Sequence, residues 1–328
     1  MKSIFRRALV ALLVIILVAT AWLTWQWNFR SALAFAPERV LLPAAHNPGS
    51  LRVTFLGVSS LLFEDGDTAI LIDGFFTRPG KATVLAGTIA PDPQRIASAL
   101  QRAGIERLAA VIVAHSHYDH VMDAPEVARR TGALVVGSES TANVARGWRL
   151  AEDRIRITHN GDKLRFGRFQ ITLTESRHAP TGFTGGRISE PLVPPVHASS
   201  YQEGESYSLL IAHDGKSILV QSSAGFAAGA LHGQKADIVF LGIGMLGKQG
   251  DAFRQDYWRE TVATVGARRV IPIHWDDFTL PLDQPLVPLP WPFDDFDASM
   301  DFISERAQQD GIDVKFLPAW EKIDPFIE

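Results

Sequence analysis

The sequence predicts a mixed α/β (α+β) fold in which β-sheets pack on each other and are covered by helices. Three observations support this prediction. Adjacent strand patterns fill residues 51–73, short apolar runs then alternate with helical patterns, and the second half returns to strands before it ends in alternating strands and helices. With 328 residues, 46% of them hydrophobic, the chain is long and apolar enough to bury such a core.

An apolar segment near the N-terminus predicts a membrane anchor. Three basic residues precede an uncharged stretch from Ala8 to Phe29, and residues 8–27 would span about 30 Å as a helix, which matches a bilayer core. The basic flank predicts an inner-membrane anchor with a cytoplasmic N-terminus and a domain that faces the periplasm or the exterior. Tryptophans at the far end are typical of an interfacial belt: Trp22, Trp25 and Trp27.

A cleaved signal peptide is the alternative for this segment. Ala19-Thr20-Ala21 has the small-x-small pattern of a cleavage site and follows a short apolar run, and cleavage there would give a secreted protein. The anchor is favoured because the apolar character continues past Ala21. We therefore assign residues 1–30 to the anchor or signal, residues 31–50, with their prolines, to a tether, and residues 51–328 to one domain.

The first half of the domain opens with a meander and continues with strand and helix pairs. Strands are predicted by β-rich or fully apolar runs at Leu51 to Gly57, Ser60 to Glu64, Thr68 to Asp73, Ala109 to Ala114 and Ala133 to Gly137. The last two runs are apolar enough to be buried on both faces. Helices are predicted at Pro93 to Gly104, Pro125 to Thr131 and Thr141 to Trp148.

The second half returns to strands. They are expected at Lys163 to Phe166, Phe169 to Glu175, Tyr207 to Ala212, Ser217 to Gln221, Ile238 to Leu241 and Val270 to Ile273. The Asp214-Gly215 pair predicts a hairpin turn between the third and fourth of them. Helices are expected at Phe253 to Val265 and Ala298 to Gln309.

Composition excludes several classes of protein. The sequence has no cysteine, so disulfide frameworks, thiolate metal sites and cysteine nucleophiles are excluded, and any metal must be held by nitrogen and oxygen. After residue 45 the chain carries 27 basic and 35 acidic residues, with no basic run that would favour binding to nucleic acid. The ten histidines leave metal binding open.

The histidines concentrate where a buried strand ends. Residues 115–120 read His-Ser-His-Tyr-Asp-His and directly follow the apolar run that ends at Ala114. Residues i and i+2 of an extended segment point the same way, so His115 and His117 can converge on one metal. A turn after Tyr118 would let Asp119 and His120 reach a second metal.

This segment resembles the H-x-H-x-D-H motif of the metallo-β-lactamase superfamily, and the similarity covers most of residues 51–325. The resemblance implies a four-layer αββα sandwich, which agrees with the pattern above. It also implies that Asp73 supports the metal loop. The ligands that it implies form two sets, His115, His117 and His178 for the first metal and Asp119, His120 and His274 for the second.

One position departs from the family's pattern. A bridging aspartate usually follows the strand that ends here at Gln221, but Ser223 occupies its place. Because a serine hydroxyl is a neutral and weak ligand, we expect one firmly held metal at the three-histidine set and a weaker second one. Asp276 or Asp277 is a candidate source of the missing charge.

The chemistry expected of such a site is hydrolysis. All-nitrogen and oxygen ligation suits Zn²⁺, with iron or manganese as alternatives, and a zinc-bound water becomes a hydroxide nucleophile near neutral pH. Asp119 is the candidate catalytic residue that would orient this hydroxide and carry a proton to the leaving group. A non-catalytic metal-binding protein of the same fold is the alternative, and the serine at position 223 is the observation in its favour.

The sequence gives weaker signals for the substrate than for the metal site. The Ile-Pro-Ile-His-Trp end at residues 271–275 resembles the superfamily branch of ascorbate-6-phosphate lactonase and N-acylphosphatidylethanolamine phospholipase D, which implies cleavage of a lactone or a phosphodiester. Aromatic side chains after the last ligand could form an apolar entrance for a small-molecule or lipid-derived substrate, and the favoured alternative is that they pack a proline-rich loop onto the domain. These are Trp275, Phe278, Trp291 and Phe293. The sequence predicts no oligomeric state.

Overall fold

Two seven-stranded sheets pack face to face in the computed structural model, which describes residues 2–327 except 29, 31–36, 44–48 and 183–184. The first sheet has the order β14 (Lys322–Ile323), β1 (Arg52–Phe55), β2 (Leu61–Glu64), β3 (Ala69–Ile72), β4 (Ala110–Ile112), β5 (Leu134–Gly137) and β6 (Ile155–Ile157). The second has the order β13 (Asp313–Val314), β12 (Arg269–Ile273), β11 (Ile238–Gly242), β10 (Lys216–Gln221), β9 (Ser206–His213), β8 (Phe169–Ser176) and β7 (Lys163–Phe166).

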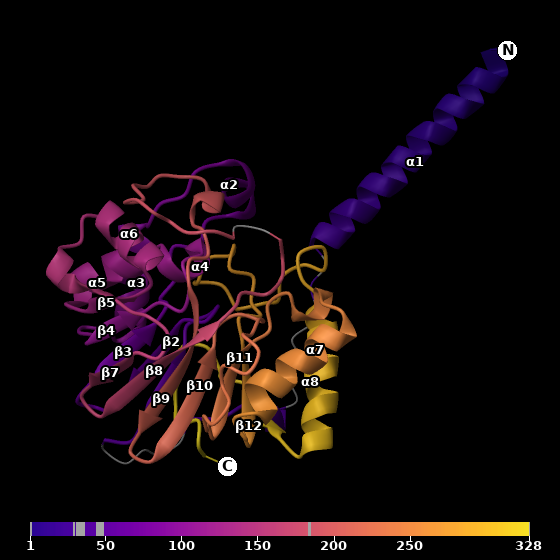
Figure 1. The fold of residues 1–328 in the computed structure, drawn as a ribbon. Coiled ribbons are helices and arrows are strands. Elements are labelled where there is room, and N and C mark those ends of the chain that lie inside the picture. The colour runs from indigo at the N-terminus through magenta and orange to yellow at the C-terminus, as the bar shows by residue number, and fades with distance from the viewer. Residues whose placement is uncertain (1, 29, 31–36, 44–48, 183–184, 328) are drawn as a thin grey trace.

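Helices cover the outer face of each sheet (Figure 1). The first sheet is covered by α3 (Pro93–Ala103), α5 (Ala124–Thr131) and α6 (Glu139–Gly147). The second is covered by α7 (Asp251–Trp258), which a π-helical turn at Arg259–Ala263 continues, and by α8 (Phe296–Asp310). The four-layer αββα sandwich predicted from the sequence is confirmed.

The main core lies between the two sheets and a second core lies under the helices of the first sheet. Phe63 of β2 contacts Phe240 of β11 across the sandwich, with ring centroids 5.9 Å apart. Leu71 of β3 faces the other way and joins Ile96 of α3 in the second core. Strands β3, β4, β5 and β6 are parallel, and β4 is buried on both faces as its apolar run predicts.

Local signals account for the ends of the helices. Asp92 caps α3 by accepting hydrogen bonds from the backbone N–H groups of Gln94 and Arg95, and Pro93 occupies the first turn. Gly104 then ends the helix in the left-handed conformation, which glycine adopts without steric cost. The sequence missed α2 (Lys81–Ala86), whose cap Gly80 offers no side-chain hydrogen bond, and the single-turn helix α4 (Tyr118–Val121), where it predicted a turn.

The first helix, α1 (Lys2–Asn28), projects from the domain (Figure 1). Its segment Ser3–Asn28 has a mean hydropathy of 2.5 and is long and apolar enough to cross a membrane. Part of the segment predicted as a tether contacts the domain, because Leu41 is buried and its N–H donates to the carbonyl of Phe316. Short 3₁₀ helices lie at Pro37–Arg39, Glu152–Arg154, Ala198–Ser200 and Leu246–Lys248.

The strand directions bring several loops to one edge of the sandwich. In the first sheet the parallel strands β3 and β4 both end there. In the second sheet β8, β10, β11 and β12 also run the same way, because β9 is antiparallel to both β8 and β10. The segments after β4, β8, β10 and β12 carry the histidines and the serine singled out by the sequence, so the fold gathers them at this edge.

Candidate metal centre

Three histidines from two sheets form the first cluster. His115 lies just beyond β4, His117 is the residue before α4, and His178 follows β8. One ring nitrogen of each lies within 4.8 Å of the others, and Nε2 of His115 is 3.2 Å from Nδ1 of His117. The structure thus brings together the three side chains expected to hold the first metal.

The second cluster lies beside the first. Asp119 and His120 come from α4, and His274 directly follows β12. Nε2 of His274 is 3.2 Å from Nε2 of His120 and 3.3 Å from Oδ2 of Asp119. The rings of His115 and His120 are only 3.8 Å apart between centroids, so the two clusters form one site.

Asp73 supports this site from below, as the family resemblance implies. One carboxylate oxygen accepts the backbone N–H of Ala114 at 2.8 Å, and the other is 2.8 Å from Nδ1 of His120. Ser59 contacts the same carboxylate and the same ring nitrogen. A carboxylate accepts but does not donate, so Nδ1 of His120 carries the proton and Nε2 presents its lone pair to the cluster.

The donor chemistry fits a divalent metal. The Nδ1 atom of His178 is 2.8 Å from the carbonyl oxygen of Ala179, which can only accept a hydrogen bond. His178 therefore also directs an unprotonated Nε2 inward. Neutral imidazoles and a carboxylate that converge within a few ångströms are the ligands expected of a site for zinc, iron or manganese.

Burial and neighbouring histidines keep His115 and His178 of the first cluster neutral. Burial, reinforced by repulsion from His120, holds the pKa of His115 well below its usual value. Burial and repulsion from His117 lower the pKa of His178 to about 3. These imidazoles need not lose a proton to bind a metal at neutral pH.

In the second cluster, opposite charges on neighbouring side chains shift the pKa values of His120 and Asp119. Burial lowers the pKa of His120, but the charges of Asp73 and Asp119 outweigh it, so the net shift is upward. Burial raises the pKa of Asp119, and His120 and His274 more than reverse that effect. Asp119 is therefore held as a carboxylate, the form needed in a ligand or a proton acceptor.

Ser223 lies at the edge of this site. Its hydroxyl accepts the backbone N–H of Ala179 at 3.1 Å. Gly225 packs so closely on His178 that an added Cβ would lie 2.5 Å from the carbonyl carbon of His178. The Ser223 loop thus contacts the segment that carries the third ligand of the first cluster.

Neither aspartate proposed as a substitute for the missing bridge is free for that role. Asp276 forms a buried ion pair with Arg78 at 2.7 Å and accepts the N–H of Val58. Asp277 forms ion pairs with Arg30 and Lys81. The negative charges of Asp276 and Asp277 are therefore compensated by neighbouring cations and are not available to a metal.

The Arg78–Asp276 pair holds the loop that carries His274. Val58 has a positive φ of 53°, which is costly for a β-branched residue. Asp276 accepts the N–H of Val58 at 2.7 Å, and the carbonyl of Val58 accepts the N–H of His274 at 2.6 Å. The ion pair is fully buried, with Arg78 only 1% exposed.

Replacing Arg78 with methionine should destabilise the domain by roughly 3–5 kcal/mol, because the Asp276 carboxylate would remain buried without its cation. Thermal unfolding of the full chain in detergent would measure the effect. The matched change Arg268→Ala removes an exposed arginine from a surface pair and should leave the midpoint nearly unchanged. Equal midpoints for the two variants would contradict the role assigned to the buried pair.

Glu203 is a positioning residue that the sequence did not reveal. Its backbone carbonyl accepts the N–H of Ser116 at 2.8 Å, and its carboxylate accepts the N–H of His178 at 3.1 Å and the hydroxyl of Ser206 at 2.8 Å. It therefore links the metal loop of one sheet to the third histidine of the other. Glu203 lies in an irregular loop, and no sequence motif at this position indicates the contact.

Two other side chains lie in the interior. His213 precedes the Asp214-Gly215 hairpin turn, where an exposed polar side chain is common, but it is buried and its Nε2 is 2.9 Å from the carboxylate of Asp65. Trp275 does not lie at an apolar entrance but packs onto the domain, because it is buried against Phe55 and Phe296 in the main core. In both cases the other sheet supplies a partner that lies far away in the sequence, Asp65 after β2 and Phe55 on β1.

The fold and the site together define a metal-binding αββα sandwich, with two ligand clusters at the edge where its strands end. The family model of the beta-lactamase superfamily domain matches residues 68–275. The chain therefore belongs to the metallo-β-lactamase superfamily.

Relatives agree with this assignment. A UPF0173 metal-dependent hydrolase of Heliobacterium modesticaldum is 25% identical over 244 residues, covering 70% of this chain and 84% of that protein. A second one, from Listeria monocytogenes, is 26% identical over 243 residues, covering 72% and 90%. The structure of a possible metal-dependent hydrolase from Veillonella parvula has a TM-score of 0.51 at 16% identity, covering 84% and 98%, and supports the fold.

Proposed function

We propose that this protein is a membrane-anchored, metal-dependent hydrolase that cleaves an ester-type bond, with a phosphodiester or a lactone as the favoured substrate. The observation that carries the proposal is the convergence of two ligand clusters at one edge of the sandwich, where hydrogen bonds at Nδ1 leave Nε2 of His120 and of His178 as the ligand atom. The relatives named above as metal-dependent hydrolases support the reaction class. The apolar helix α1 supports the anchor.

Zinc is the proposed metal. When bound, it would supply a hydroxide nucleophile near neutral pH and polarise the oxygen of the bond to be cleaved. His115, His117 and His178 would hold the firm site, and Asp119, His120 and His274 the weaker one. The protein's own task is to orient these imidazoles, which Asp73 and the carbonyl of Ala179 do through hydrogen bonds to Nδ1 of His120 and Nδ1 of His178.

Asp119 is the proposed catalytic residue. It is almost fully buried, its carboxylate lies 3.3 Å from His274, and its pKa is held low by the surrounding histidines. A carboxylate at this position can orient the attacking water and accept its proton, and can then pass that proton to the leaving group.

A substrate panel tests the proposed reaction. The full chain in detergent would be assayed against phosphodiester, lactone, thioester and β-lactam substrates after zinc, iron or manganese has been added. We expect turnover of a phosphodiester or a lactone that a chelator removes and added metal restores. Tight metal binding without turnover of any of the substrates would instead favour the non-catalytic alternative.

Ser223→Asp should convert the weaker site into a firm one. A carboxylate at this position can offset the repulsion between two divalent ions. We expect about one tightly bound metal per wild-type chain and nearly two in the variant, measured by elemental analysis after dialysis. Ser223→Ala is the control and should keep the wild-type value. Two firmly held metals in the wild type would contradict the weak-site proposal, and none would contradict metal binding itself.

A further inference from the structure

The end of the anchor helix is attached to the domain beside the metal centre. The ring of Trp27 meets that of Phe293 edge to face, with centroids 4.7 Å apart. The guanidinium of Arg30 donates to Asp277 at 2.6 Å and to the carbonyl of Pro288 at 3.1 Å. A passive tether would need none of these contacts.

Asp277 joins three parts of the molecule at this junction. It lies three residues after His274, and its side chain is completely buried. The same carboxylate oxygen that receives Arg30 also receives Lys81, the first residue of α2, at 2.9 Å. The loop after His274, the chain just after α1 and the start of α2 therefore meet at the carboxylate of Asp277. Movement of α1 relative to the loop after His274 would break a partly buried ion pair and leave the completely buried Asp277 side chain with one cation fewer.

Exposed apolar side chains lie on elements around the junction. Leu85 on α2 and Val193 are each 63% exposed, and Trp291 is 44% exposed. Backbone hydrogen bonds between Ile89 and Val196 tie the end of the α2 segment to the loop that carries Val193. Figure 1 shows α2 on the same upper side of the domain as the end of α1.

The surroundings of these apolar groups suit a lipid headgroup region. The ammonium of Lys248 lies 3.9 Å from the ring centroid of Trp291, and Lys81 lies over Phe293 at 5.8 Å. Lysine and tryptophan side by side are typical of the interface between membrane and water. Phe278, whose ring lies edge-on to His274 at 5.8 Å, extends the apolar surface to the metal ligands.

We propose that Arg30 and Trp27 dock α1 rigidly on the domain, so that α2 and the segment around Val193 rest on the bilayer that α1 crosses. The metal centre then faces the lipid surface and takes amphiphilic esters whose acyl chains stay in the membrane. This substrate class rests on the proposed function, whereas the docked orientation does not.

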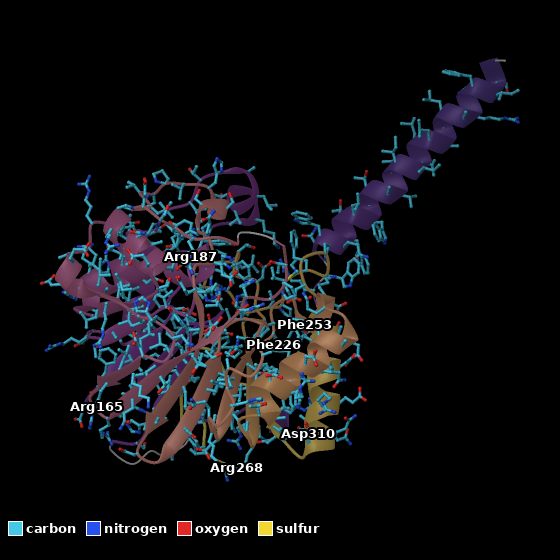
Figure 2. All side chains as sticks on the ribbon, in the orientation of Figure 1. Arg165, Arg187, Phe226, Phe253, Arg268 and Asp310 are labelled. Atoms are coloured by element: carbon cyan, nitrogen blue, oxygen red, sulfur yellow. The ribbon has the colours of Figure 1, made fainter. Side chains whose placement is uncertain are left out.

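The absence of cysteine allows a direct test of the orientation. Single cysteines would be introduced as Leu85→Cys, Val193→Cys and Arg268→Cys in the full chain, labelled with a nitroxide and reconstituted in phospholipid nanodiscs. Figure 2 shows Arg268 at the opposite end of the domain, where it serves as the aqueous control. Power saturation in electron paramagnetic resonance then measures how accessible each label is to oxygen, which enters the lipid, and to a nickel chelate, which stays in water. The ratio of the two accessibilities gives the depth of the label.

We expect labels at positions 85 and 193 to be accessible to oxygen and protected from nickel, and the label at position 268 to show the reverse. Arg30→Ala should make the first two labels accessible to nickel, and Arg30→Lys should largely preserve their protection. Equal accessibility of all three labels, or no effect of Arg30→Ala, would overturn the docked orientation. Release of a processed chain from the membrane fraction would also overturn it.

A second measurement tests the substrate class. Two esters with the same headgroup, one with an acetyl and one with a palmitoyl chain, would be supplied to the wild type and to Arg30→Ala in nanodiscs. We expect the variant to lose about tenfold in kcat/KM for the long-chain ester only, because its site is no longer held at the lipid surface. An equal loss for both esters, or none, would overturn the amphiphile inference. If neither ester is cleaved by the wild type, the proposed function fails, while the label data still decide the orientation.

Discussion

His117→Ala is expected to lower hydrolysis by about 10³-fold or more, equivalent to about 4 kcal/mol of transition-state stabilisation. The imidazole belongs to the first cluster, where its Nδ1 lies 3.2 Å from Nε2 of His115. Without it the firm site would keep only two histidines, and the metal would be lost. Turnover of the best substrate of the panel and metal content by elemental analysis would be measured on the same preparation.

The matched control for this prediction is His159→Ala. His159 is exposed and belongs to neither ligand cluster, so the variant should keep wild-type turnover and metal content. Loss of metal with retained turnover in His117→Ala would show that the reaction does not depend on this centre. Retention of both would remove His117 from the set of ligands.

Asp119→Asn is expected to reduce kcat by about 10²- to 10⁴-fold while much of the metal at the first cluster is kept. The amide has the size of the carboxylate but lacks its charge, so it cannot accept a proton from water. The first cluster uses His115, His117 and His178 and remains intact. The rate constant would be measured at saturating substrate, and metal content would be determined before and after dialysis.

A surface aspartate separates the chemical effect from a general change of charge. Asp153→Asn alters an exposed turn and should leave both rate and metal content unchanged. An Asp119→Asn variant that keeps its metal and turns over at the wild-type rate would rule out the catalytic role. Loss of the firmly held metal from this variant would show instead that Asp119 belongs to the first site.

Much of the fold could be predicted because its signals are local. The run Ala109 to Ala114 is apolar throughout and became a strand buried on both faces. Asp92, Pro93 and Gly104 mark the start and the end of α3 within the sequence itself. The short helices α2 and α4 were missed because one lacks a side-chain cap and the other is a single turn.

The candidate site was predictable where its residues are neighbours in sequence, and less so elsewhere. His115, His117, Asp119 and His120 lie within six residues, so backbone geometry alone brings them near one another. Glu203 links the metal loop to the third histidine, and no pattern in the sequence could pair it with Ser116. Such contacts depend on loops from different sheets that meet at the shared edge.

The sequence by itself determined the kind of ligand and therefore the class of chemistry, because the absence of cysteine and the cluster at residues 115–120 leave only imidazole and carboxylate donors. Only the tertiary structure decided which carboxylates near the site are paired with cations and which can bind a metal. Asp276 and Asp277 lie two and three residues after His274 in the sequence, yet Arg78 pairs with the first and Arg30, just after α1, pairs with the second. Side chains far apart in the chain become partners only after the sheets have packed, so the contact between Arg30 and the loop after His274 could not be inferred from the sequence.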